Sequence, residues 1–237
     1  MLSPKDVKYF KNGFEENKKF WERLNIFPSF KNKLVLDFGC GHGAMCVDIA
    51  KRKVNKILGI DKNTKLINFA KKNITYNFNT LKKKIFFHKN LYNINLTKKF
   101  DYIISKDTFE HTVGLNKVLD FFYKILKKNG KVFIGFGPVY YFYNGDHGRT
   151  NSFFPWGHLV LPKNFLFYNK VKKLEELGLN GYSHEKYIEI IKNSKFKIEY
   201  LKENKSDHPI FLLINFLRKI NFLKKFLTNN LYIILKK

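Results

Sequence analysis

The chain has 237 residues, a formal net charge of +26 and a hydrophobic content of 44%. This length suits one large domain, and the apolar and aromatic content excludes a disordered chain. The two cysteines, Cys40 and Cys46, exclude a disulfide scaffold and suit a reducing compartment. No apolar run reaches the length of a membrane span, and the N-terminus has no apolar signal core. We therefore expect a globular cytoplasmic protein.

The charge does not by itself predict a nucleic-acid partner. Lysine and arginine together number 45, but only four are arginine, the residue that base-reading proteins favour. The lysine excess comes with abundant Phe, Asn, Ile and Tyr, and AT-rich codons encode all of these residues. The lysines are also spread along the chain and form no single stripe. Composition therefore disfavours nucleic acid as the main partner.

The first half of the chain alternates short apolar runs with amphipathic stretches. The runs predict buried strands, and the stretches between them predict helices. In chain order we expect a helix at 4–23, a strand at 33–38, a helix to residue 51, a strand at 56–61, a helix capped by Asn63 to residue 73, strands at 85–88 and 100–105, a helix at 115–127, a tight turn at Asn129-Gly130 and a strand at 131–136. Such alternation is typical of βαβ units in a parallel sheet.

The rhythm breaks at 137–182, which is rich in Gly, Pro, Tyr, Trp and His. Regular elements return as a helix from Ser183 to Asn193, a strand at 196–201, a helix at 209–227 and a strand at 231–235. The pattern predicts an α/β fold with a doubly wound, mostly parallel, seven-stranded sheet and an insertion after the fifth strand. We expect one domain made of a helical segment (1–30), a ligand-binding core (31–136), an insertion that serves as a lid (137–182) and a C-terminal helix-strand-helix-strand part (183–237).

A glycine-rich turn follows the first predicted strand. The strand ends near Asp37, and Gly39, Gly41 and Gly43 lead into a helix. Glycines let the backbone approach a ligand closely, and the helix N-terminus presents unpaired N–H groups. Asp61 ends the next strand, where a carboxylate can accept hydrogen bonds from both ribose hydroxyls. We therefore expect a cofactor that contains a nucleoside.

Glycine spacing alone does not identify this cofactor. Gly39-x-Gly41-x-x-Ala44, with Asp61 about 20 residues further on, also satisfies the relaxed dinucleotide fingerprint. Asp37 argues against a dinucleotide, because a carboxylate there would repel a pyrophosphate and attract an ammonium group. A dinucleotide also leaves the stretch at 105–111 unexplained.

Four stretches together resemble the class I S-adenosylmethionine-dependent methyltransferases, most closely the small-molecule group that includes the ubiquinone-biosynthesis type enzymes. They are Leu34-Val-Leu-Asp-Phe-Gly-Cys-Gly-His-Gly43, Leu58-Gly-Ile-Asp61, Phe100-Asp-Tyr-Ile-Ile-Ser-Lys-Asp-Thr-Phe-Glu-His111 and Leu126-Lys-Lys-Asn-Gly-Lys-Val132. The resemblance implies an enzyme that methylates a small-molecule, sugar or lipid-like acceptor. Two alternatives stay open: a domain that binds the cofactor without catalysis and serves as a scaffold, and an NAD-dependent enzyme.

The resemblance also implies which residues bind S-adenosylmethionine. Asp37 and Gly39 would lie by the methionine moiety, and Asp61 would bind the ribose. Asn90 would hold the adenine amino group, at a position where the family usually has an acidic residue. The whole implied set is Asp37, Gly39, Cys40, Gly41, Gly43, Asp61, Lys62, Asn90, Leu91, Ser105 and Lys106, of which Ser105 and Lys106 would border the methionine carboxylate through their backbone. The Asn-Pro-Pro-Tyr type element of amino-group DNA methyltransferases is absent after the fourth strand, which further favours a small-molecule acceptor.

Acceptor-side candidates come from the insertion. Residues 137–162 combine aromatic side chains with His147 and His158, and they leave the sheet at the edge where a substrate must arrive. Neutral histidine is well matched to accepting a hydroxyl proton, so we predict a catalytic role for His147 or His158. His111 is a further candidate, with a purely structural hydrogen bond as its alternative. A metal site that uses Asp146 would have no diagnostic spacing, and we predict no metal.

The predicted helix at 209–227 has a broad apolar face with basic residues beside it. The apolar positions include Ile210, Leu213, Leu217 and Ile220, and the basic residues are Arg218, Lys219, Lys224 and Lys225. Such a helix either covers the sheet between the last two strands or lies on an anionic membrane surface. Peripheral membrane contact is therefore a second expectation for this segment.

Overall fold

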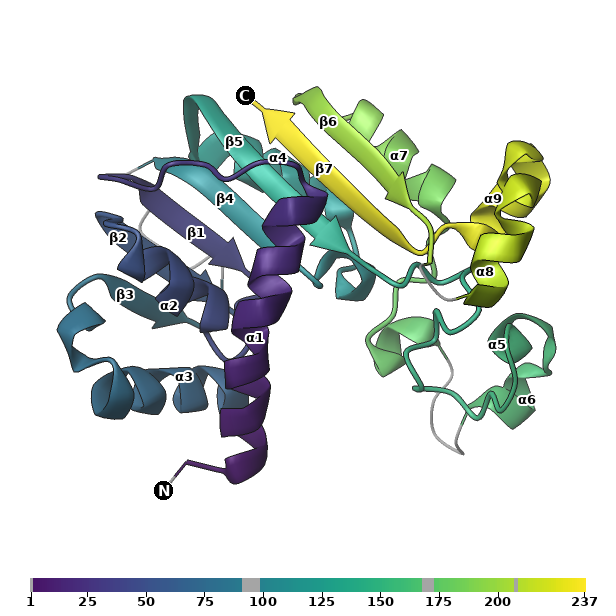
Figure 1. The fold of residues 1–237 in the computed structure, drawn as a ribbon, viewed down its shortest axis with the longest axis horizontal. Coiled ribbons are helices and arrows are strands. Elements are labelled where there is room, and N and C mark those ends of the chain that lie inside the picture. The colour runs from purple at the N-terminus through teal and green to yellow at the C-terminus, as the bar shows by residue number, and fades with distance from the viewer. Residues whose placement is uncertain (1, 91–98, 168–172, 207–208) are drawn as a thin grey trace.

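The computed structural model describes residues 2–90, 99–167, 173–206 and 209–237 (Figure 1). Its centre is a seven-stranded sheet in the order β3-β2-β1-β4-β5-β7-β6. The strands are β1 (Leu34–Phe38), β2 (Lys56–Ile60), β3 (Ile85–His88), β4 (Phe100–Lys106), β5 (Leu126–Phe136), β6 (Lys197–Asn204) and β7 (Asn230–Lys236). Strands β1 to β5 pair in parallel, whereas β7 is antiparallel to both β5 and β6. The predicted α/β fold with a mostly parallel sheet is confirmed.

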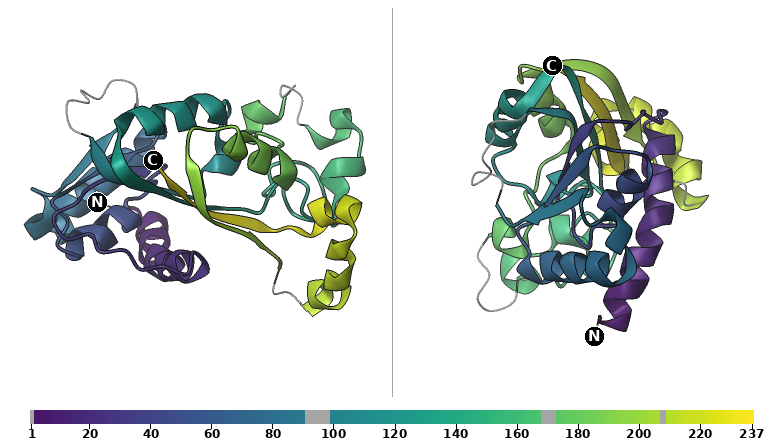
Figure 2. Two further views of the ribbon diagram at one scale, coloured as in Figure 1. Left: turned by 90° about the horizontal axis from the view of Figure 1, so that it is seen from above. Right: turned by 90° about the vertical axis from the view of Figure 1, so that its left-hand side faces the viewer.

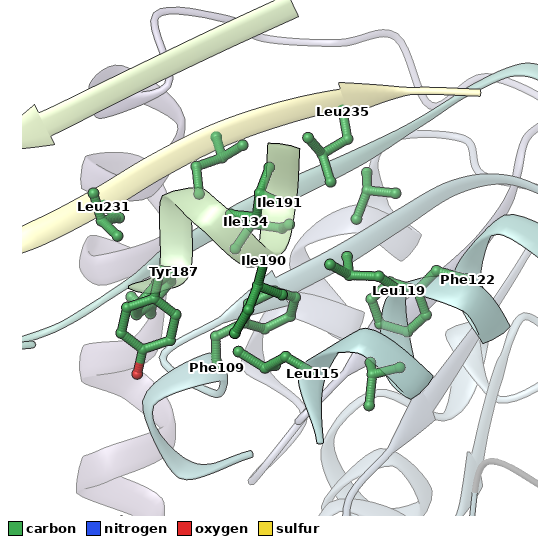
Figure 3. Packing of buried hydrophobic residues seen from close by; sticks show 14 of the residues in the cluster. Phe109, Leu115, Leu119, Phe122, Ile134, Tyr187, Ile190, Ile191, Leu231 and Leu235 are labelled. Atoms are coloured by element: carbon green, nitrogen blue, oxygen red, sulfur yellow. The ribbon is translucent and has the colours of Figure 1, made fainter. Parts of the chain in front are cut away.

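Helices cover both faces of the sheet. They are α1 (Pro4–Arg23), α2 (Ala44–Lys51), α3 (Thr64–Asn77), α4 (Leu115–Ile125) and α7 (His184–Lys192), with short 3₁₀ turns η1 (Asn79–Leu81) and η2 (Phe109–His111). Helices α1 to α3 pack against strand residues such as Val35. On the opposite face α4 and α7 pack against strand residues such as Ile134, as Figure 3 shows. Successive strand residues point to opposite faces of the sheet. Since helices cover both faces, the central strands carry apolar residues on both.

Local signals start three helices where the sequence predicts them. Pro4 is the first residue of α1, a position at which its missing N–H costs nothing. The side chain of Asn63 accepts the Lys65 N–H at 3.0 Å at the start of α3. The hydroxyl of Ser183 accepts the Lys186 N–H at 3.3 Å at the start of α7. Each cap satisfies a backbone donor that the helix itself leaves unpaired.

The predicted turn before the fifth strand is wrong in detail. Helix α4 ends at Ile125, and β5 begins at once with Leu126. Asn129 keeps the positive φ of a turn, 61°. The Asn129 N–H nevertheless donates to the Lys237 carbonyl, and the Lys237 N–H donates to the Gly130 carbonyl. A partner from the far end of the sequence therefore extends the strand through the turn.

The predicted single helix at 209–227 is also wrong. The segment forms three pieces: α8 (Pro209–Ile214), η4 (Asn215–Lys219) and α9 (Asn221–Leu227). Both later pieces begin at an asparagine, a residue that favours helix starts over helix interiors. One long amphipathic face is thus replaced by short turns that point in several directions.

The insertion after β5 contains little regular structure. Its elements are α5 (Gly157–Val160), α6 (Lys163–Leu166) and η3 (Leu174–Leu177). Helices α5 and α6 lie near α8 and α9 at one end of the molecule in both Figure 1 and Figure 2. Within the described residues, no helix has the length and apolar character needed to cross a membrane.

Candidate active site

The loop between β1 and α2 is shaped for close backbone approach. Gly39, Gly41 and Gly43 have φ values of 82°, 49° and 82°, which L side chains rarely adopt. The N–H groups of Gly39 and Cys40 both donate to the Ile60 carbonyl, so the loop is tied to the end of β2. A Cβ placed on Gly41 would meet nothing within 4 Å apart from its chain neighbours. The loop therefore presents its backbone to open space, as a cradle for a ligand requires.

The turn after β4 lies directly against this loop. A Cβ on Gly39 would lie 1.9 Å from Thr108 Oγ1, so only glycine fits there. Thr108 Oγ1 donates to the Lys106 carbonyl at 2.9 Å, and Asp107 between them has a positive φ of 51°. This tight turn carries the residues that follow β4 to the glycine loop.

Asp37 is a buried carboxyl beside the loop. Its side chain is 2% exposed, and the Cys46 thiol donates to Oδ2 at 3.2 Å. Burial raises the pKa of Asp37 to about 7, although the Cys46 hydrogen bond and the charge of Lys106 act in the opposite direction. A cationic ligand group next to Asp37 would favour its ionised form, so the residue suits an ammonium group.

Asp61 organises the loop as well as facing the site. Its Oδ2 accepts the Gly41 N–H at 2.9 Å, and its Oδ1 accepts the Asn63 N–H at 2.7 Å. Each carboxylate oxygen has a further lone pair, so both oxygens can still accept a ribose hydroxyl. The sequence predicts only the ribose contact, and the two backbone bonds give Asp61 a second role.

The other predicted cofactor residues differ in their surroundings. Ser105 is buried, and its hydroxyl has no hydrogen-bond partner among the described residues. Lys106 Nζ lies 3.3 Å from Asp107 Oδ2. Lys62 and Asn90 are exposed at the ends of their strands, and Leu91 lies outside the described residues. The two cysteine thiols are buried, and burial raises the pKa of both.

Helix α1 covers the glycine loop, which sequence reasoning does not predict. A Cβ on Gly13 would lie 2.6 Å from the Ala44 Cβ at the start of α2, so the two helices approach closely there. His42 in the loop contacts Asp6 of α1, with Nε2 and Oδ1 3.0 Å apart. One turn after Gly13, Asn17 is 1% exposed, and neither of its amide atoms has a partner in the described part of the chain. An unpaired buried amide is costly, so Asn17 is a strong candidate for binding a ligand.

Glu110 is a second buried carboxyl, between the cofactor loop and the insertion. Its Oε1 accepts the Gly137 N–H at 3.4 Å, while Oε2 has no partner among the described residues. Burial, and secondly the neighbouring carboxylate of Asp107, raise the pKa of Glu110 well above its usual value. Burial therefore favours the protonated form of Glu110, and Oε2 is left for a further hydrogen bond.

His111 has both ring nitrogens in use. Its Nδ1–H donates to the Gly178 carbonyl at 2.8 Å, and its Nε2 lies 3.5 Å from the Arg149 guanidinium. Arg149 also donates to the Leu177 and Gly178 carbonyls. Burial, with help from the Arg149 charge, lowers the pKa of His111 to about 4. His111 is therefore a neutral, structurally bound histidine and a weak base.

His147 packs against His111, with 5.0 Å between the ring centroids. Its Nε2–H donates to the Pro138 carbonyl at 3.0 Å, which leaves the lone pair on Nδ1. Burial lowers the pKa of His147, so it too is neutral near pH 7. The two rings differ because Nε2 of His111 faces the Arg149 guanidinium, whereas the hydrogen bond of His147 to Pro138 engages only its Nε2.

His158 lies in a different environment. It is 3% exposed, its Nε2–H donates to the Tyr140 carbonyl at 2.7 Å, and its buried Nδ1 has no partner among the described residues. Asp146 accepts a hydrogen bond from the Thr150 hydroxyl at 2.6 Å. The described residues contain no group of three side chains suited to hold a metal ion. The structure thus brings His111 and His147 together and gives His158 a separate buried place.

Comparison with known proteins identifies this arrangement. Residues 29–136 match the profile of a family described as a methyltransferase domain. The fold resembles that of an S-adenosylmethionine-dependent methyltransferase from Mesorhizobium loti, with a TM-score of 0.59 and 15% identity over 92% of this chain and 97% of that one. The fold of geranyl diphosphate C-methyltransferase from Streptomyces coelicolor A3(2) matches with a TM-score of 0.64 and 13% identity, over 93% and 78% of the two chains. Residues 29–136 therefore form a methyltransferase domain, and the chain has the fold of S-adenosylmethionine-dependent methyltransferases.

Curated relatives match about half of this chain. The chain is 31% identical over 148 residues to the mitochondrial ubiquinone biosynthesis O-methyltransferase of Dictyostelium discoideum. The matched residues cover 56% of this chain and 44% of that protein. The chain is also 34% identical over 128 residues to phosphoethanolamine N-methyltransferase 3 of Arabidopsis thaliana, covering 52% and 24%. The chain thus spans less than half the length of these relatives. Their names state different reactions, O-methylation in one and N-methylation in the other.

The residues of this site fit S-adenosylmethionine, the cofactor on which the Mesorhizobium loti methyltransferase with this fold depends. The open backbone at Gly41, the buried carboxyl of Asp37 and the unpaired Ser105 hydroxyl offer the donors and acceptors that a charged methionine end needs. The assignment of single residues to methionine, ribose and adenine stays a prediction. Sequence reasoning missed Asn17 and Thr108. Their signal is spatial, because Thr108 lies against Gly39 and Asn17 is buried in a helix that packs near the glycine loop.

Proposed function

We propose that this protein transfers the methyl group of S-adenosylmethionine to a small-molecule, sugar or lipid-like acceptor. The observation that carries the proposal is the contact between Thr108 and the glycine loop at Gly39. It joins the turn after β4 to the cofactor loop, and three residues later the same turn contacts His147 through His111. The methyl donor and the polar residues of the insertion are thus expected to share one site.

We further propose that His147 is the general base when the acceptor is a hydroxyl. Nδ1 of His147 carries the lone pair that can take the proton. His111 is a poorer base, because burial and the Arg149 charge lower its pKa to about 4. His158 is nearly inaccessible at 3% exposure, which favours a structural role. These environments support His147 over the other two candidates.

When bound, S-adenosylmethionine supplies a methyl group already activated by its sulfonium. The protein's own residues then have to hold the acceptor in line and exclude water. In the protonated form that burial favours, Glu110 can donate one hydrogen bond, which suits orienting an acceptor oxygen. His147 can take the proton released by a hydroxyl acceptor, a step typically worth about 10²–10⁴ in rate.

The test combines binding with product detection. Calorimetry should show that the full chain binds S-adenosylmethionine, and incubation with a metabolite extract should give a component that gains one CH₂ in mass. The same incubation with S-adenosylhomocysteine is the control for cofactor-dependent products. Tight binding without any product would favour the alternative of a non-catalytic scaffold. Absence of binding would overturn the proposal.

A further inference from the structure

One end of the molecule carries most of its exposed large apolar side chains. Of the thirteen such side chains in the described residues, eight lie within 153–165 and 213–222. They are Phe153, Phe154, Val160, Phe165, Leu213, Phe216, Ile220 and Phe222. The helices that carry or adjoin them, α5, α6, α8 and α9, lie at the same end in Figures 1 and 2. We call these eight residues the apolar end.

An open apolar pocket links the two segments of the apolar end. It has a volume of about 330 Å³, and Trp156 and Val160 of the insertion line it together with Leu223 and Phe226 of α9. All its lining side chains are apolar. The insertion and α9 therefore form one continuous apolar surface, larger than scattered single side chains would give.

The charge around this surface is mostly positive. The sequence has no aspartate or glutamate within 147–174 or 208–237, although the chain carries 19 acidic residues. Lys225 Nζ lies 4.8 Å from the ring centroid of exposed Phe222 and 4.9 Å from that of Phe226. Arg218 and Lys224 share a single acidic partner, Glu203, so an excess of positive charge remains.

We propose that the apolar end docks the protein on an anionic lipid bilayer. Exposed phenylalanine, leucine and isoleucine side chains suit insertion at the boundary between headgroups and acyl chains. Lysines next to them can place their ammonium groups among anionic headgroups while their stems cover apolar surface. The exposed apolar side chains therefore favour a bilayer as the partner. The lysines, and the absence of acidic residues from both segments, favour a bilayer with anionic headgroups. This surface is separate from the residues assigned to methyl transfer.

The two tryptophans allow a direct measurement of docking. Trp156 lines the apolar pocket, whereas Trp21 of α1 is fully buried in the core. Vesicles of phosphatidylcholine and phosphatidylglycerol that carry brominated acyl chains should quench Trp156 emission in the full chain. The Trp156→Phe variant should lose the quenching, and vesicles of phosphatidylcholine alone should quench only weakly.

Flotation with the same vesicles tests which residues bind. The triple variant Leu213→Ser, Phe216→Ser, Phe222→Ser should reduce the partition coefficient at least tenfold, because it removes three of the inserted side chains. Lys219→Gln with Lys225→Gln should reduce it by roughly fivefold per charge and weaken its salt dependence. The matched control is Phe27→Ser with Tyr76→Ser, which removes two side chains of 60% and 70% exposure outside the apolar end. This control should float like the unmodified protein, and all variants should keep cofactor affinity.

Three outcomes would overturn the proposal. One is failure of the unmodified protein to float with anionic vesicles. Another is equal loss in the triple variant and the control pair, which would mean that the basic surface in general binds lipid. The third is a dimer in analytical ultracentrifugation that the triple variant converts to a monomer without any flotation, which would assign the apolar end to a second copy of the chain.

Discussion

The cofactor half of the molecule and its insertion are built in opposite ways. Residues 29–136, which match the methyltransferase family, consist of parallel strands and a loop whose ligand groups are mostly backbone. The match ends at the last residue of β5, and the irregular insertion begins there. In the insertion, side chains hold the backbone: His147 donates to Pro138, His158 to Tyr140 and Arg149 to Leu177. The family match therefore covers the regular half of the molecule, and the irregular insertion lies outside it.

The largest effect should come from the insertion, at His147. His147→Gln keeps a donor for the Pro138 carbonyl but cannot act as a base, so turnover on a hydroxyl acceptor should fall by about 10²–10⁴. Cofactor affinity should stay within a few-fold. His158→Gln is the matched control, and it should keep turnover because that histidine is buried against Tyr140. Single-turnover rates measure the methyl-transfer step, and calorimetry measures cofactor affinity. An equal loss of turnover in the two variants would remove the distinction between these histidines.

The pH profile sharpens the same prediction. Burial lowers the pKa of His147 below the usual value of about 6.5. A general base works in its neutral form, so activity should persist as the pH falls through about 6.5 and decline only at more acidic pH. A turnover that halves near pH 7 or above would show that another group supplies the base.

The next effect belongs to the cofactor half and concerns Asp37. Burial raises its pKa from 3.8 to about 7. The folded protein therefore holds this proton at a pH where the unfolded chain has lost it. The resulting stabilisation is fully present below pH about 4 and is lost as the pH rises through about 7, and the loss in the free energy of unfolding is about 4 kcal/mol at most. Asp37→Asn should flatten the fall in the free energy of unfolding across this window. Urea unfolding at several pH values measures it, and an equally steep fall in the variant would assign the slope elsewhere.

The glycine loop allows a comparison within a few residues. A Cβ on Gly39 would lie 1.9 Å from Thr108 Oγ1, whereas a Cβ on Gly41 would meet nothing within 4 Å. Both positions have positive φ, which costs roughly 1–2 kcal/mol for alanine. Gly39→Ala should therefore lower the free energy of unfolding by about 3 kcal/mol and Gly41→Ala by about 1 kcal/mol. Equal losses in denaturant unfolding would mean that Thr108 moves away freely.

Asp61 should give a smaller effect, expressed in binding. Asp61→Ala removes the acceptor for the Gly41 and Asn63 N–H groups and for the ribose, so cofactor affinity should fall at least tenfold. The ribose part is isolated with S-adenosylhomocysteine and its 2′-deoxy analogue. The unmodified protein should prefer the 2′-hydroxyl form, and the variant should lose that preference. An unchanged preference would contradict the ribose assignment.

Particular residues show how far the sequence predicts this molecule. The glycine spacing, Asp37 and Asp61 are local signals for the family resemblance and its cofactor loop, and Asn63 and Ser183 are local signals for the helices that they cap. The extension of β5 depends on Lys237, which no local pattern near Asn129 contains. The break in the predicted helix at 209–227 likewise reflects packing that its apolar periodicity does not encode. In the site, the contact of Thr108 with Gly39 joins residues almost 70 positions apart. Such contacts arise from tertiary structure and have no motif.

Asn17 provides the last test, on the boundary between local and tertiary signals. Its amide is buried in α1 with no partner among the described residues, which costs roughly 1–3 kcal/mol unless a ligand completes its hydrogen bonds. Neighbouring residues of α1 place it near the cofactor loop: Gly13 approaches Ala44, and Phe20 would lie 2.8 Å from a Cβ placed on Gly135 of β5.

Asn17→Leu keeps a similar shape and removes the unpaired amide. If the amide binds the methionine end of the cofactor, the variant should be as stable as the unmodified protein or more so, yet bind S-adenosylmethionine about five- to tenfold more weakly. Thermal unfolding without ligand and calorimetry with it separate the two terms. Unchanged affinity together with raised stability would show that Asn17 is a defect of the core. Weaker binding with unchanged stability would place α1, which the family match at 29–136 does not include, in the cofactor site.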